Sequence, residues 1–150
     1  MKFLLLISLV LAMAGCAKTE LSLDELEKLI PGSQAIETES MHYVFEGNHA
    51  GYFIVLQSQA SKESFEKLIS SSDHEPKPFY AEIVSDYRES FHRSFRDLRM
   101  DAIPDWFQFD PSPDSQKLRL RGSNSWTSEF LYDVIYDPRS DTLWLEGGGI

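Results

Sequence analysis

The sequence predicts a single α+β domain, in which an antiparallel sheet built from hairpins packs against two or three helices. Apolar runs of strand length stand in pairs around turns rich in glycine, proline and aspartate, the pattern of antiparallel hairpins. One stretch, residues 52–70, reads as a strand followed by a helix. This unit does not recur, which argues against the repeated strand-helix units of a parallel sheet. The length of 150 residues suits one core.

The first helix is predicted from its start and stop signals. Ser22 and Glu25 have the spacing of a capping box, in which each side chain accepts a hydrogen bond from the other residue's backbone N–H. Pro31 and Gly32 end the helix. The apolar residues at helical spacing between these signals are Leu23, Leu26, Leu29 and Ile30.

A hairpin and a second helix follow. Residues 41–46 and 52–58 are rich in strand-forming residues and flank a loop that has glycine at each end. The second strand is continuously apolar from residue 52 to residue 56, so we expect it in the centre of the sheet. Ser61 is placed to cap a helix that ends near Ser70. Residues 71–78, which contain two prolines, are predicted to form a loop.

The clearest periodicity lies in the middle of the chain. It predicts a long helix over residues 80–99, closed by Pro104, and then a short aromatic strand or arm over residues 106–109. The apolar residues that recur every three or four positions are Val84, Tyr87, Phe91, Phe95 and Leu98.

The last third of the chain is predicted to be β. Residues 117–121 alternate basic and leucine residues, as a half-buried strand does. Residues 129–136 and 142–146 form a hairpin around the turn at 137–141. The three glycines at 147–149 are expected to fray.

The charge balance limits the kinds of partner. The chain has 24 acidic and 14 basic side chains, for a formal net charge of −10. Such a field repels nucleic acid, so we expect no nucleic-acid partner. It promotes solubility, and it favours a cationic protein of the cell envelope as a partner. One such partner is a cationic enzyme that attacks the envelope and that this acidic chain would inhibit.

The first residues have the three zones of an export signal. Lys2 is followed by an apolar run over residues 3–11 and by a small-residue exit at Ala14 and Gly15. The run is too short for a permanent membrane span. It closes on Met13-Ala14-Gly15-Cys16, which resembles the lipobox of bacterial lipoproteins.

The resemblance implies cleavage before Cys16, a diacylglycerol thioether on its sulfur and an acylated amino terminus. Several acyl chains hold a protein on a membrane almost permanently. The expected organisation is a cleaved signal peptide at 1–15, a tether at 16–21 and one domain at 22–150. In enteric-type bacteria an Asp after the lipidated cysteine retains such proteins at the inner membrane. Ala17 stands there, so we expect a periplasm-facing lipid anchor, with the outer membrane favoured.

Lipidation also removes the chain's only thiol. Cys16 is the sole cysteine, so the mature protein is predicted to contain no disulfide and no catalytic thiol. A zinc site that needs cysteine is excluded on the same ground.

The predicted long helix carries the first candidate site, a basic stripe. Its four members fall at i, i+4, i+8 and i+11 and share one side of the helix. Guanidinium groups bind carboxylate or phosphate bidentately, and a histidine tunes such a site near neutral pH. The alternative is that the arginine stems flank the core and pair with acids of the domain. The stripe consists of Arg88, His92, Arg96 and Arg99.

The second candidate is an aromatic group around Trp106 and Phe107. Neighbours in a strand point to opposite faces, so one of the two is exposed unless both faces are covered. The group either lines a ligand groove or a partner-binding surface, or belongs to the core. Its other members are Phe109, Trp126 and Trp144.

No metal or cofactor is predicted. His42 with His49, His74 with Glu75, and Asp137 with Asp141 lack a recognised ligand spacing. The sequence contains no nucleophile elbow, and residues 122–125 read as a polar loop. It also lacks a phosphate-binding glycine loop.

Three functions fit these observations. The favoured one is a non-enzymatic binding or interaction module of the cell envelope. One alternative is an envelope hydrolase that uses His92 or His74 with a carboxylate beside an aromatic cleft. The other is a carrier of a small amphipathic anion, which requires a cavity between the long helix and the sheet with two or more arginines turned into it.

Overall fold

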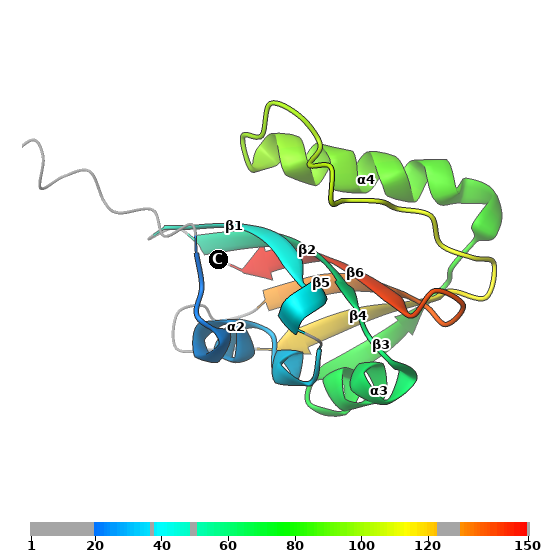
Figure 1. The fold of residues 1–150 in the computed structure, drawn as a ribbon, viewed down its shortest axis with the longest axis horizontal. Helices are drawn as coiled ribbons and strands as arrows, with labels where there is room; N and C mark the ends of the chain where they lie inside the picture. The colour runs from blue at the N-terminus through cyan, green and yellow to red at the C-terminus, as the bar shows by residue number, and fades with distance from the viewer. Residues whose placement is uncertain (1–19, 37, 49–50, 123–129, 150) are drawn as a thin grey trace, which may run out of the picture.

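A six-stranded antiparallel sheet forms the centre of the protein, with helices on both of its faces (Figure 1). The structure is a computed structural model and describes residues 20–36, 38–48, 51–122 and 130–149. It confirms the predicted α+β single domain. In spatial order the strands are β1 (His42–Asn48), β2 (Gly51–Gln59), β6 (Thr142–Gly149), β5 (Phe130–Asp137), β4 (Gln116–Gly122) and β3 (Asp73–Lys77).

Two short helices cover one face of the sheet. The capping box at Ser22 forms as predicted, and α2 (Leu23–Leu29) begins there. The hydroxyl of Ser61 accepts a hydrogen bond from the backbone N–H of Ser64 at 3.1 Å and starts α3 (Lys62–Ser70). Single 3-10 turns follow α2 at Ser33–Ala35 and Thr38–Ser40.

The long helix lies on the opposite face. It is shorter than the predicted 80–99, because a 3-10 turn at Ala81–Ile83 precedes it and α4 spans Val84–Asp97. After α4 the chain returns between the helix and the sheet as an extended segment before β4 (Figure 1).

Strand alternation gives the sheet two cores. Toward α2 and α3 the strands contribute mainly aliphatic and tyrosine side chains, among them Ile54, Tyr132 and Leu145. Toward α4 the core is aromatic. Its buried members are Val55, Phe91, Phe95, Leu98, Phe107, Phe109, Ile135 and Trp144.

The predicted loop at 71–78 is wrong, because residues 73–77 form strand β3 and pair with β4. A strand on the edge of a sheet needs hydrogen bonds on one side only, so it tolerates Pro76. Four of its five residues are exposed, so the sequence has no apolar alternation to reveal it.

The predicted aromatic segment at 106–109 is the extended arm and not the strand, the two forms that the sequence left open. Its backbone joins no strand but is held by side chains: the N–H of Gln108 donates to Oε1 of Gln57 at 2.8 Å. The indole N–H of Trp144 donates to the carbonyl of Gln108 at 3.0 Å. Phe107 and Phe109 pack into the aromatic core, so the apolar spacing reflects burial beneath α4.

The glycines at 147–149 do not fray. They extend β6 and pair with both β2 and β5. A Cβ on Gly147 would lie 2.1 Å from the carbonyl oxygen of Leu131, and one on Gly148 would lie 1.9 Å from that of Tyr52. Glycine is therefore required where three backbones lie this close.

The terminal hairpin turn forms as predicted and is organised by Asp137. Its carboxylate is buried and accepts hydrogen bonds from Ser112, from the backbone N–H of Arg139 and from the hydroxyl of Ser140. Burial alone would raise the pKa of Asp137, but these donors together hold the pKa below its ordinary value. The residue therefore acts as a turn former.

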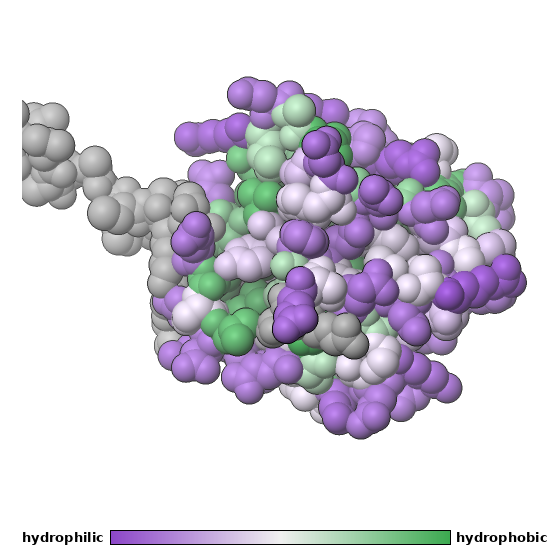
Figure 2. All heavy atoms as spheres, in the orientation of Figure 1, coloured by the Kyte–Doolittle hydropathy of each residue, from purple (hydrophilic) through white to green (hydrophobic). Residues whose placement is uncertain are grey.

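The surface is mostly hydrophilic, and in Figure 2 hydrophobic atoms show through mainly on the left half of the view. Among the described residues, the exposed large hydrophobic side chains are Leu23, Tyr80 and Leu131. No helix within the described ranges is long and apolar enough to cross a membrane.

Candidate functional site

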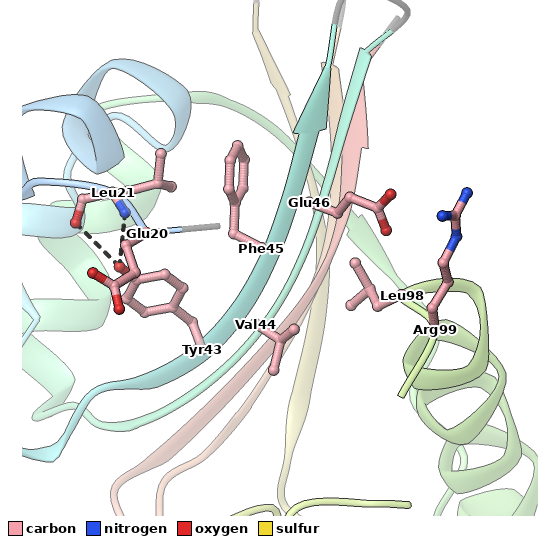
Figure 3. Close-up of a pocket in the computed structure, with 8 residues that line it drawn as sticks. All are labelled: Glu20, Leu21, Tyr43, Val44, Phe45, Glu46, Leu98 and Arg99. Atoms are coloured by element: carbon pink, nitrogen blue, oxygen red, sulfur yellow. Dashed lines mark hydrogen bonds between the residues drawn. The ribbon is translucent and has the colours of Figure 1, made fainter. Parts of the chain in front are cut away.

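A groove of about 640 Å³ runs along the outer edge of β1 (Figure 3). Within the described part of the chain, β1 pairs with β2 and with no other strand. One side of its backbone is therefore open at the groove. We call this feature the β1 groove, and its lining residues are Glu20, Leu21, Tyr43, Val44, Phe45, Glu46, Leu98 and Arg99.

The start of the domain forms one wall. The backbone N–H of Leu21 donates to the hydroxyl of Tyr43 at 3.1 Å, and that hydroxyl donates to the carbonyl of Leu21 at 3.1 Å. These two bonds fix Leu21 beside the strand. In Figure 3 they lie on the same side of β1 as the ring of Phe45.

The end of α4 forms the other wall. The N–H of Met100 donates to the carbonyl of Phe95 and that of Arg99 to the carbonyl of Arg96, the two bonds of a Schellman motif. Arg99 takes the left-handed position with φ +58°, where glycine is usual and another residue costs about 1 kcal/mol. This turn places Leu98 and Arg99 beside β1.

Two oppositely charged side chains, Glu46 and Arg99, line this groove. Figure 3 shows the side chains of Glu46 and Arg99 on the same side of β1. Neither forms an ion pair within 4.0 Å among the described residues. The groove thus combines an open strand edge and apolar walls with charged groups that have no partner in the described chain.

The predicted basic stripe does not form one site. Arg88 donates to the carbonyl of Phe109 at 3.0 Å and so holds the segment beneath α4. Arg96 pairs with Glu89 at 3.0 Å, as the alternative interpretation expected. His92 is half-buried and lines neither the β1 groove nor the cavity under α4 described below. Arg99 lies beyond the helix end and alone of the four reaches the groove.

The two predicted aromatic residues have different environments. Phe107 is buried and packs edge-on against Phe95, with ring centroids 4.8 Å apart. Trp106 is half-buried and stacks on His42 of β1 at 5.5 Å. Phe107 is therefore a core residue, and Trp106 covers the first residue of the edge strand. Trp126 lies outside the described residues.

A row of charged side chains on the α4 face was not predicted from the sequence. The strand register aligns one residue each from β6, β5, β4 and β3, in the order Glu146, Asp133, Arg119 and Glu75. Arg119 binds both oxygens of Asp133, at 2.8 and 3.1 Å. Hydrogen bonding to Asp133 raises the pKa of the Arg119 guanidinium. Single acids within the apolar runs of β5 and β6 were the available signal.

Helix α4 binds the inner end of this row. The hydroxyls of Ser90 and Ser94 donate to the two oxygens of Glu146 at 2.7 and 2.5 Å. A cavity of about 40 Å³ lies beside them, with Lys117 as its basic residue. The cavity is large enough to hold a water. Its lining contains no arginine, whereas a carrier of a small amphipathic anion would require two or more.

The other candidate residues gain no site. His74 is exposed on β3, with Nδ1 3.3 Å from the carbonyl oxygen of Ser72. The described residues contain no group of three or more histidine, cysteine, aspartate or glutamate side chains that could hold a metal ion. Cys16, His49 and residues 123–125 lie outside the described residues.

Comparison with protein-family models, with curated proteins and with solved structures finds no match to this chain. The function is therefore inferred from the chain's own residues.

Proposed function

We propose that this chain is a bacterial lipoprotein, anchored through Cys16 and periplasm-facing, whose domain is a non-enzymatic binding module of the cell envelope. The observation that carries the proposal is the export signal ending in Met13-Ala14-Gly15-Cys16. Ala17 favours delivery to the outer membrane. The anchor would hold the domain at the membrane, so its binding partners would be molecules of the cell envelope.

The β1 groove supports binding as the activity of the domain. Its volume of about 640 Å³ falls within the range of protein ligand sites. The hydrolase alternative needs a histidine, an acid and a concave aromatic wall within hydrogen-bond reach. Neither His92 nor His74 lines the groove or the cavity beneath α4.

Labelling with radioactive palmitate tests the anchor. The full chain is expressed in a Gram-negative host and compared with Cys16→Ser. We expect wild type to take up label, to lose residues 1–15 and to enter the detergent phase on phase separation. Cys16→Ser should remain unlabelled and unprocessed. A wild-type protein with an unmodified cysteine and an intact amino terminus would contradict the proposal.

A second variant tests the membrane. In an enteric host, Ala17→Asp should move the labelled protein from outer-membrane to inner-membrane fractions on a sucrose gradient. If both proteins fractionate with the inner membrane, the proposed outer-membrane location is wrong.

A further inference from the structure

We infer that the β1 groove binds an extended, basic segment of another envelope protein, which adds to β1 as a seventh strand of the sheet. The inference rests on the proposed function, because it names the class of partner for that binding module. Strand addition obtains affinity from backbone hydrogen bonds along an open edge and specificity from the pockets that receive alternate side chains.

The backbone of β1 is suited to this role. Natural sheets protect their edges with proline, lysine, bulges or short strands, because an open edge pairs with other chains. β1 has seven residues without proline or lysine, and it pairs with β2 in unbroken register from His42 to Asn48. At about 3.3 Å per residue it presents an edge of roughly 23 Å.

The walls specify a single added strand. Leu21, Tyr43 and Phe45 lie on one side of the strand, and Val44 and Leu98 on the other (Figure 3). An incoming strand places alternate side chains against these two apolar surfaces. A second copy of this protein would bring an equal pair of walls into the same space, so a lone segment fits better.

Charge selects a basic segment. The chain has a formal net charge of −10, and Glu46 and Glu20 line the groove against Arg99 alone. A lysine or arginine beside Glu46 would neutralise a carboxylate that has no ion-pair partner in the described chain. Two copies of an acidic chain repel each other, which further disfavours self-pairing.

The anchor limits where the partner lies. Glu20 lines the groove and follows Cys16 by four residues, a span of at most about 14 Å when fully extended. Lipidation of Cys16 would therefore keep the groove close to the bilayer. The partner segment would belong to a protein in or against the same membrane.

A fluorescent peptide tests the inference on the full mature chain in detergent. The probe is Lys-Val-Thr-Val-Lys-Val-Thr-Lys, which places its valines and the last lysine on one face and its threonines and the other two lysines on the opposite face. We expect saturable binding by fluorescence anisotropy. Two controls should bind at least tenfold more weakly: the peptide with glutamate for lysine, and the peptide N-methylated at its four central residues, which cannot form the ladder.

Matched variants locate the binding. Glu46→Lys places a lysine on the β1 edge and should weaken binding at least tenfold, and Glu46→Gln should weaken it less. Asp73→Lys makes the same charge change on the exposed β3 edge and should stay within twofold of wild type. Circular dichroism confirms that each variant is folded.

The outcomes separate the two proposals. The inference would be overturned if the peptide does not bind, or if the N-methylated peptide binds as tightly as the unmodified one. It would also be overturned if Asp73→Lys and Glu46→Lys change the affinity equally, or if the protein dimerises through β1 and excludes the peptide. If the protein binds the peptide but carries no lipid, the strand-addition site stands, and the proposals of a lipid anchor and of a partner near the membrane are wrong. Lipidation without peptide binding would do the reverse.

Discussion

The two edges of the sheet are built differently. β3 is short, contains Pro76 and carries Asp73, Glu75 and Lys77 on one face. Glu75 lies within ion-pair distance of Lys77 at 2.8 Å and of Arg121 at 3.1 Å. β1 is longer and has apolar residues at its centre, and its Glu46 has no ion-pair partner in the described chain.

This difference shows that one edge is protected against pairing and the other is not. Proline and charge on β3 are the features that prevent edge-to-edge association. β1 has no proline and a single carboxylate, Glu46, and it is flanked by walls from the start of the domain and the end of α4.

The largest effect is expected at Gly148, in the strand that joins the two halves of the sheet. β6 connects β2, which carries β1, with β5, which carries β4 and β3. Gly148→Val should destabilise the protein by about 3 kcal/mol or more, because its Cβ would lie 1.9 Å from the Tyr52 carbonyl oxygen. Urea unfolding followed by circular dichroism measures the free energy of unfolding.

The control is the residue opposite in β5. Leu131 is 39% exposed, and Leu131→Val should cost less than about 1 kcal/mol. If Gly148→Val is as stable as the control, the close backbone approach in β6 is not essential to the sheet.

The second effect concerns the ion pairs on the β3 side. Arg119→Met should cost about 1 kcal/mol, because it removes both hydrogen bonds to Asp133 from a partly exposed site. A double-mutant cycle with Asp133→Asn should give a coupling energy of similar size. Glu46→Gln on the β1 side should stay within about 0.5 kcal/mol of wild type. A coupling energy of zero would mean that this pair contributes nothing.

The third effect follows from removing the proline and the lysine that protect the β3 edge. Pro76→Val with Lys77→Val should change unfolding stability by less than about 1 kcal/mol, since strand preferences span about that range. The same variant should associate at high salt, which screens the repulsion between acidic chains, because its edge can then pair. Sedimentation velocity should show a mass that rises with concentration, while Asp73→Lys shows no rise beyond wild type. A double variant that sediments like wild type would show that β3 needs no protection.

The smallest effect is a titration on β3. The hydrogen bond and charge of Lys77, with Arg121 and Arg119 adding to them, lower the pKa of Glu75 from its ordinary value of 4.5. A lowered folded-state pKa means that the stabilisation is present above the ordinary value and is lost as the pH falls through the folded value. Carboxyl carbon NMR should give a midpoint below 4.5 that rises in Lys77→Met.

The matched change is Lys28→Met in the last turn of α2. It should leave the Glu75 midpoint where it is. A midpoint that does not respond to Lys77→Met would remove the ion pair from the account of the β3 edge.

Local sequence signals predicted most of the fold. The capping box at Ser22, the cap at Ser61 and the turn at residues 137–141 all form as their residue types require. The prediction failed where an element has no apolar pattern, as in β3. It also failed at Gly148, where the requirement for glycine comes from strands distant in sequence.

The candidate site was largely beyond sequence analysis. The β1 groove joins residues 20–21, 43–46 and 98–99, which no local pattern connects. The charged row from Glu146 to Glu75 depends on the register of four strands. Of the predicted site residues, Arg99 reaches the groove, and it does so through the turn that ends α4 rather than through the helical stripe.

Residue-resolved hydrogen exchange on the full mature chain, with and without the lysine-valine-threonine peptide, tests the central claim most directly. In β1 the N–H groups of alternate residues point away from β2. Strand addition predicts that these backbone amides gain protection from exchange, while the amides of β3 do not change. Unchanged exchange along β1 under saturating peptide, or protection confined to β3 or α4, would contradict it.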